Sequence, residues 1–148
     1  MECKKITKQF SFVGIKSNGA FAAFGTEVPK AARQFMARAD EIAQHAGTEI
    51  AIFEPKKDEL HLDGSYYVGL IVNEVPTDLP SGMDFIELSQ EYVTVRGDIN
   101  QIGRLHSGLM KWAGEQGYRR NPDAYIVETY HPLGNGHEEV EVYLPVYA

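Results

Sequence analysis

The feature of this sequence that most constrains its fold is an internal repeat. Four segments of the first half have counterparts in the second half, in the same order, at offsets of 80, 70, 77 and 74 residues. Each half is predicted to form a strand, a helix and two further strands. The prediction for residues 1–148 is a single α+β domain. In it, repeats over about residues 1–75 and 83–148 form a pseudo-two-fold antiparallel sheet with two helices and a central ligand groove.

The segments that define the repeat are short and mostly apolar. They are Phe12-Val13-Gly14 with Tyr92-Val93-Thr94, the helix before Gly47 with the helix before Gly117, Ile52-Phe53-Glu54-Pro55 with Thr129-Tyr130-His131-Pro132, and Tyr67-Val68-Gly69-Leu70-Ile71-Val72 with Glu141-Val142-Tyr143-Leu144-Pro145-Val146. The differing offsets indicate small insertions, so the repeat is one of pattern rather than of identical residues.

The helices of both halves are predicted from apolar side chains at steps of three and four residues. In the first half this spacing extends over residues 28–46, where Pro29 suits the first helical turn and Gly47 suits the end of the helix. In the second half Asp98 is predicted to cap a helix that ends before Gly117. The inner face of this second helix carries Ile102, Leu105, Leu109 and Trp112.

Strands are predicted where apolar residues alternate with polar ones between turn residues. These segments are residues 6–16, 49–54, 66–74, 83–95, 124–131 and 139–147. The stretch 75–82 contains two prolines and a glycine, so it is predicted to link the halves. The last two strands are predicted to form a hairpin.

The charge balance of the chain argues against nucleic acid as a partner. Asp and Glu total 21 against 14 Lys and Arg, which gives a net charge of -7, and binding to nucleic acid needs basic side chains along the phosphates. An acidic surface instead raises the local concentration of cations. The sequence therefore predicts a cationic small molecule as the partner and no direct binding to nucleic acid.

The sequence predicts no metal, no cofactor and no association with a membrane. The single cysteine, Cys3, excludes an internal disulfide and a multi-cysteine zinc site, and the five histidines lack the spacing of metal ligands. The glycines are too scattered to form a phosphate-binding loop. The chain lacks a secretory signal and the apolar run of about 20 residues that spans a membrane. It is expected to be soluble and cytoplasmic.

Glu128 is the most informative single residue, because only the second half carries a carboxylate inside an aromatic strand. In an extended strand Ile126, Glu128 and Tyr130 share one face. A charge among apolar neighbours is costly unless a partner or a ligand compensates it. One interpretation places this face in the groove, where Glu128 meets a lipophilic cation. The other places Glu128 on a wet surface of an edge strand, and the sequence leaves both open.

Aromatic residues are candidates for the walls of such a groove. Trp112 lies on the inner face of the second helix, where packing in the core is the more common role. Tyr67 and Tyr143 lie in predicted strands and could belong either to the core or to the groove. Aromatic rings near a bound cation contribute roughly 0.5–2 kcal/mol through cation–π contacts.

Several short motifs together resemble the gyrase-inhibitor-like (GyrI-like) small-molecule-binding domain, which is also the effector-binding half of AraC-type and MerR-type multidrug regulators. The resemblance covers nearly the whole chain. Its motifs are Phe12-Val13-Gly14-Ile15, Tyr66-Tyr67-Val68-Gly69, Pro80-Ser81-Gly82-Met83, Tyr92-Val93, Trp112, Ile126-Val127-Glu128-Thr129-Tyr130 and Val142-Tyr143-Leu144-Pro145-Val146. Each motif is weak alone, whereas their order and spacing together are specific.

The resemblance implies a duplicated fold with a ligand groove between the halves, a buried glutamate at Glu128, and aromatic walls at Tyr130 and Trp112. Many members carry a Trp early in the first helix, and Phe35 is the residue that replaces it here. Regulators of the family also carry a DNA-binding domain, for which this chain has no residues left. The predicted ligand-binding residues are Glu128, Tyr130, Trp112, Tyr67, Tyr143 and Phe35.

Three functions remain open from the sequence. The first is a stand-alone effector-binding protein for lipophilic, cationic, aromatic compounds, in which no residue is catalytic. The second is a hydrolase of strained electrophilic toxins, as some similar domains imply, in which Glu128 activates water and Tyr130 or Tyr143 protonates the leaving oxygen. The third is a protein-interaction module of the gyrase-inhibitor type, with a protein partner or a second copy of the chain.

Overall fold

The computed structural model describes residues 2–42 and 45–148, and for Ala46 the backbone. Within these residues the strands are β1 (Lys4–Ala20), β2 (His45–Phe53), β3 (Asp63–Val72), β4 (Asp84–Asp98), β5 (Ile126–Gly134) and β6 (His137–Val146). The α-helices of the same residues are α1 (Phe24–Phe35) and α2 (Ile102–Glu115). Short 3-10 helices lie at Phe21–Ala23, Met36–Glu41 and Ile99–Gln101.

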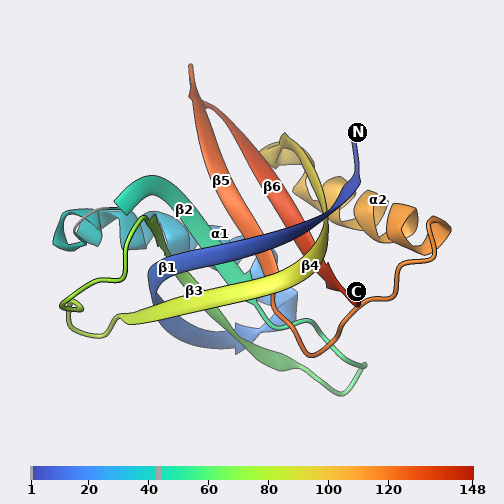
Figure 1. The fold of residues 1–148 in the computed structure, drawn as a ribbon, viewed down its shortest axis with the longest axis horizontal. Helices are drawn as coiled ribbons and strands as arrows, with labels where there is room; N and C mark the ends of the chain where they lie inside the picture. Colours follow the sequence, from blue (N-terminus) through green and yellow to red (C-terminus); the bar gives the residue numbers. More distant parts are fainter. Residues whose placement is uncertain (1, 43–44) are drawn as a thin grey trace.

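The strands form a closed antiparallel barrel in the order β1-β3-β2-β5-β6-β4 (Figure 1). Three adjacent strands come from each half of the chain. The halves meet along two seams, where residues 4–14 pair with 84–94 and residues 49–53 pair with 126–130. The predicted α+β class with an antiparallel sheet is confirmed, and the sheet closes on itself.

Side chains that alternate along the strands divide the apolar residues between two cores. The core inside the barrel consists of strand residues: Phe10, Phe12, Ile50, Ile52, Tyr92, Val127 and Tyr143. The outer core lies beneath the helices, where α1 packs on β2 and β3 and α2 packs on β4 and β6. Ile126 and Tyr130 belong to the outer core. Glu128 lies between them in the alternation and therefore shares the face that the helices cover.

The first helix differs from the prediction in both of its ends. α1 begins at Phe24 and ends at Phe35, and the chain continues in 3-10 turns to Glu41, whereas the apolar spacing predicts one helix over residues 28–46. Pro29 consequently lies inside the helix rather than in its first turn. The prediction was wrong because apolar spacing identifies the buried face of a segment and does not distinguish an α-helix from tighter turns.

Gly47 does not end a helix. It lies in β2 with a φ of +80°, at a register shift between His45 and Glu49. An irregularity of this kind in a strand, like the end of a helix, favours a residue with positive φ, and glycine adopts it without steric cost. The positive φ of Gly47 is therefore used at an irregularity in a strand, and not at the predicted helix end.

The second helix agrees with the prediction. The Asp98 carboxylate accepts a hydrogen bond of 2.8 Å from the backbone N–H of Asn100, which starts the 3-10 turn before α2. Gly117 follows the helix with a φ of +82°, a backbone conformation typical of helix ends. Leu105 and Leu109 are buried on its inner face. Neither helix of the described residues is long and apolar enough to cross a membrane.

The two halves pair their strands in the same register. Adding 80 to the numbers in β1, 77 in β2 and 74 in β3 converts pairings of the first half into pairings of the second. Corresponding pairs are Phe12–Ile71 with Tyr92–Pro145, and Ile50–Gly69 with Val127–Tyr143. The helices correspond differently from the prediction, because they begin 78 residues apart, at Phe24 and Ile102, and not 70.

Candidate functional site

The candidate site is a cavity of about 250 Å³ between the first turns of α1 and α2, above the seam of β2 and β5. Its described lining contains two polar side chains, those of Glu128 and His106. The rest of the lining consists of Phe24, Gly25, Val28, Pro29, Phe53, Ile102 and Gly103. An apolar cavity with a few converging polar groups is the usual form of a small-molecule site.

Both polar side chains of the cavity lining come from the second half of the chain, and the first half contributes apolar residues and a glycine. Glu128 and Ala51 form the central pair of the short ladder between β5 and β2. Positions that correspond between the halves are Glu128 with Ala51, Tyr130 with Phe53, and His106 with Val28. The second half therefore supplies the carboxylate, the phenol and the imidazole, whereas the first half supplies small or apolar side chains at matching places.

Glu128 is held by two hydrogen bonds at the base of the cavity. Only 4% of its surface is exposed. The Tyr130 hydroxyl donates to Oε1 at 2.6 Å, and His106 Nε2 lies 2.6 Å from Oε2. Hydrogen bonds to a charged carboxylate are stronger than those between neutral groups and offset part of the cost of burying it. The carboxylate is therefore fixed in position before any ligand arrives.

Tyr130 remains a hydrogen-bond donor over the whole physiological range. Burial raises the pKa of Tyr130 well above its usual value, and the negative charge of Glu128 raises it further. Both effects disfavour the phenolate. Its hydroxyl therefore keeps the proton that it donates to the carboxylate.

A second group of charges lies beside Tyr130 and consists of two buried carboxylates and a partly exposed arginine of α1. Glu49 pairs with Tyr130 across the seam, and Arg33 Nη1 lies 2.8 Å from Glu49 Oε2. Arg33 also forms an ion pair with Glu138, which like Glu49 is buried. Two carboxylates thus share one guanidinium, and Glu128 adds a third carboxylate. With three carboxylates and one guanidinium, this region of the molecule carries more negative than positive charge.

The structure brings Glu128 and Tyr130 together, with Glu128 in the cavity lining and Tyr130 behind it as its hydrogen-bond donor. The other four predicted ligand-binding residues lie outside this cavity. Phe35 is buried in the outer core. Trp112 is half-buried and lines a different cavity, beside Cys3 and Lys4. Tyr67 and Tyr143 pack on the barrel interior, which is the opposite face of the sheet from Glu128.

The cavity is also lined by His106, Phe24 and Phe53, which are not among the ligand-binding residues predicted from the sequence. The Phe53 and His106 rings lie 6.3 Å apart, and Phe24 packs edge-on against Phe53 at 5.8 Å. A signal for His106 existed, because it lies four residues after Ile102 and three before Leu109 on the inner side of the predicted helix. Phe24 could not be found because the helix was predicted to begin later.

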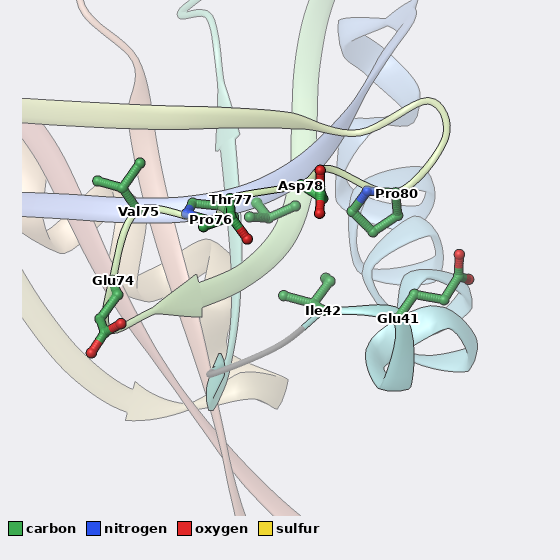
Figure 2. A pocket seen from close by; sticks show the side chains of 9 residues that line it. Glu41, Ile42, Glu74, Val75, Pro76, Thr77, Asp78 and Pro80 are labelled. Atoms are coloured by element: carbon green, nitrogen blue, oxygen red, sulfur yellow. The ribbon is translucent and has the colours of Figure 1, made fainter.

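A second cavity, of about 270 Å³, lies at the link between the halves and has different chemistry (Figure 2). It is lined by residues 74–78 and Pro80 from the link, and by Glu41 and Ile42 from the segment after α1. Its carboxylates, Glu41, Glu74 and Asp78, are exposed, so water already solvates them. This cavity therefore lacks the buried charge that distinguishes the site at Glu128. Among the described residues no three His, Cys, Asp or Glu side chains form a metal-binding group.

The fold and the cavity together define the class of the protein as an α+β barrel with a buried carboxylate between two helices. The family model of Cass2, the integron-associated effector binding protein, matches residues 5–146. The chain belongs to this family of effector-binding proteins. The resemblance to the GyrI-like effector-binding domain is confirmed.

Solved structures share the fold at low sequence identity. The structure of SAV2435 bound to tetraphenylphosphonium has a TM-score of 0.73 and 16% identity, and the match covers 100% of this chain and 95% of that chain. An integron cassette protein of Vibrio cholerae has a TM-score of 0.63 and 13% identity, with 98% and 94% covered. A hydrolase from Listeria innocua has a TM-score of 0.58 and 12% identity, with 98% and 91% covered. The comparison with curated proteins gives no match.

Proposed function

We propose that this protein binds lipophilic, cationic, aromatic small molecules in the cavity between α1 and α2, with Glu128 as the counter-ion. The observation that carries the proposal is a carboxylate with 4% exposure at the base of a cavity whose other described lining residues, apart from His106, are apolar or glycine. A buried charge is costly unless it is compensated, and a cation provides that compensation. Membership of an effector-binding family supports the proposal.

The apolar wall suits the aromatic part of such a ligand. The Phe24 and Phe53 rings line the cavity from the first half of the chain. Aromatic faces attract a nearby cation by roughly 0.5–2 kcal/mol, and apolar surface removed from water adds about 25 cal/mol per Å². The ligand of the structural neighbour SAV2435, tetraphenylphosphonium, combines the two properties, since it is a lipophilic cation with aromatic rings.

The net charge of -7 supports the same class of ligand and argues against nucleic acid. An acidic surface attracts cations to the neighbourhood of the cavity before they bind.

A calorimetric titration with tetraphenylphosphonium tests the proposal. Wild-type protein is expected to bind it, and Glu128→Gln is expected to weaken binding tenfold or more, equivalent to about 1.4 kcal/mol. Glu74→Gln is the matched control, because it removes the same charge from the exposed second cavity. Calorimetry is preferred to tryptophan fluorescence because Trp112, the one tryptophan of the sequence, lies outside the cavity. Equal affinities for wild type and Glu128→Gln would contradict the counter-ion role.

A hydrolase of strained electrophiles is the second candidate, supported by the contact between Tyr130 and Glu128. In this mechanism Glu128 activates a water molecule and the Tyr130 hydroxyl protonates the leaving oxygen. The 2.6 Å bond supplies a carboxylate and a phenol in one place, whereas Tyr143 lies on the other face of the sheet. Catalytic turnover of a cyclopropane-containing electrophile, lost in Glu128→Gln, would establish this activity. Binding without turnover would exclude it for the compound tested.

We also infer that the chain arose by duplication of one strand–helix–strand–strand unit. The shared register of the two halves supports this inference, because two unrelated units would not be expected to agree at every strand pairing. On this view the cavity formed at the contact between the copies, and the acquisition of His106, Glu128 and Tyr130 by one copy made it polar on one side.

A further inference from the structure

The bond between His106 and Glu128 occupies the same carboxylate that the proposed function assigns to a cation. His106 Nε2 approaches Glu128 Oε2 at 2.6 Å, and the Tyr130 hydroxyl approaches Oε1 at the same distance. An ionised carboxylate only accepts hydrogen bonds, so both neighbours act as donors. The His106 side chain is 23% exposed and that of Glu128 is 6% exposed. The imidazole therefore lies nearer to the solvent than the carboxylate.

We propose that His106 is a specificity-determining residue of this site, which acts as a resident counter-ion of Glu128 and competes with cationic ligands for it. The inference rests on the proposed function. A neutral imidazole donates one hydrogen bond and leaves the charge of Glu128 available to a ligand. A protonated imidazole cancels that charge and repels a second cation. One proton and one ligand cation thus compete for one carboxylate.

The titratable and charged groups that face His106, or lie beside the groups it contacts, come from α1, β2, β5 and β6. Tyr130, from the same strand as the carboxylate, is buried and its pKa is raised well above its usual value. Arg33 from α1 is paired with Glu49 from β2 and Glu138 from β6. His106 is the described lining residue whose side-chain type changes charge between about pH 5 and pH 8.

This arrangement selects ligands by charge as well as by shape. A neutral aromatic compound gains nothing from the carboxylate and would leave the bond between His106 and Glu128 in place. A permanent cation gains the attraction of Glu128 only when the imidazole is neutral. Affinity for a permanent cation is therefore expected to fall with falling pH, by at most about tenfold for each pH unit, which is the limit when one proton competes with one ligand.

Titration calorimetry with tetraphenylphosphonium between about pH 5 and pH 8 tests this proposal, since histidine titrates in that range. The probe is a fixed cation, so a pH dependence arises from the protein. Wild-type affinity is expected to fall at least tenfold from the upper to the lower end of this range. His106→Gln, which keeps a hydrogen-bond donor but cannot gain a charge, is expected to vary less than threefold. His137→Gln changes an exposed histidine of the β5–β6 hairpin and is expected to keep the wild-type slope.

Proton release on binding gives a second, independent measurement. The binding enthalpy is measured in two buffers with different heats of ionisation, at the pH where the wild-type affinity changes most steeply. The wild type is expected to release up to about one proton per ligand bound, because binding then displaces a proton from the histidine. His106→Gln and His106→Asn are expected to release no proton. Two variants are used so that the test still holds if one of them does not fold.

The outcomes separate this inference from the proposed function. Binding by the wild type that is independent of pH, or a full pH slope retained in His106→Gln, would overturn the role of His106 and leave the cation site intact. Absence of binding at every pH would overturn the proposed function and this inference with it. A slope in the wild type that disappears in both histidine variants would establish the competition.

Discussion

Glu128 and Tyr92 are two buried polar residues, and the free-energy cost of burying each is offset in a different way. Glu128 receives a hydrogen bond from Tyr130 and one from His106, which offset part of the cost of burying its charge. Tyr92 lies fully buried inside the barrel, and its hydroxyl has no hydrogen-bond partner among the described residues. It packs edge-on against Phe10 and Tyr143 instead. The barrel interior thus tolerates a polar atom because aromatic packing holds the ring in place.

The buried hydroxyl of Tyr92 predicts a pH-dependent stability. Burial raises the pKa of Tyr92 to about 12, whereas tyrosine in an unfolded chain titrates near pH 10. Because the folded pKa is the higher one, this contribution to stability is complete below about pH 10 and is lost as the pH rises towards 12. Between about pH 10 and pH 12 the free energy of unfolding of Tyr92→Phe should therefore fall by about 2 kcal/mol less than that of the wild type. This estimate follows because each unit of pKa difference corresponds to about 1.4 kcal/mol.

Urea unfolding at neutral pH and at several values above pH 10 measures this effect. Tyr147→Phe, at a residue that is 42% exposed, is the control and should follow the wild type. An identical alkaline loss in Tyr92→Phe and wild type would contradict the assignment.

The sequence identified the key carboxylate but not its partner in α2. Glu128 could be selected because a charge in an otherwise apolar strand is energetically costly unless a partner or a ligand compensates it. The signal for His106 is weaker, because its position beside the apolar face of the predicted helix is compatible with both solvent and core. The aromatic candidates Tyr67 and Tyr143 were misplaced relative to Glu128 for a physical reason: a closed barrel has an inside, and alternation alone does not say which face turns inward.

Among the elements, α1 is held to the barrel by the ion pairs of Arg33. Its guanidinium bridges Glu49 of β2 and Glu138 of β6. The carboxylates are buried whereas the Arg33 side chain is 53% exposed. The helix therefore supplies a partly solvent-exposed cation that neutralises two buried carboxylates.

Removal of this cation should destabilise the fold. Arg33→Met leaves Glu49 and Glu138 buried side by side without a partner, and we expect a loss of about 2–3 kcal/mol, at the lower end for buried pairs because the arginine is partly exposed. Adding Glu49→Gln and Glu138→Gln should restore most of the lost stability, because the two buried negative charges no longer repel each other. Chemical denaturation of the single and triple variants measures both steps. Arg38→Met, which breaks an exposed pair with Glu41, should have no measurable effect.

Two facing glycines allow β1 and β3 to approach closely. Gly14 pairs with Gly69, and a Cβ on Gly69 would lie 2.1 Å from the carbonyl oxygen of Val13. The obstacle is backbone, which cannot move aside without disturbing the pairing. The barrel therefore requires glycine at this contact, and the periodicity of the sequence does not predict that requirement.

Gly69→Ala should accordingly destabilise the protein by about 1–3 kcal/mol, the usual cost of overpacking. Gly114→Ala in α2 is the matched comparison, because a Cβ there meets open space. It should instead stabilise the protein by about 0.5–1 kcal/mol through helix propensity. Thermal unfolding of both variants checks the opposite signs, and two changes of the same sign would contradict the geometric argument.

The prediction of the elements succeeded where a single physical signal was sufficient. α2 has both a cap at Asp98 and a glycine after its end, and its limits were close to those predicted. α1 has neither signal: its N-terminal cap position, Ala23, makes no side-chain hydrogen bond, and the chain passes directly into 3-10 turns after Phe35. Local sequence therefore specified the second helix, whereas packing on β2 and β3 determines the first.

At the scale of the whole molecule, each half depends on the other for its hydrogen bonds. The seams join residues 4–14 to 84–94 and residues 49–53 to 126–130. A separated half would expose these strand edges together with the apolar side chains of the barrel interior.

Two fragments, residues 1–79 and 80–148, should therefore be poorly folded alone and should combine when mixed. Circular dichroism should show a gain of strand signal on mixing, and native mass spectrometry should show a complex with one copy of each fragment. A monomeric fragment with cooperative unfolding would contradict this expectation, because it would mean that one half supplies a sufficient core.

The position of the cavity over the shorter seam has a thermodynamic consequence. A ligand that touches α1, α2 and Glu128 contacts both halves at once, so it binds the assembled molecule and not a molecule whose halves have separated. At a free concentration of 100 times its Kd, such a ligand adds about 2.7 kcal/mol to the free energy of unfolding. The melting temperature thus reports occupancy of the site, and a library of candidate effectors can be ranked by thermal shift without knowledge of the natural one.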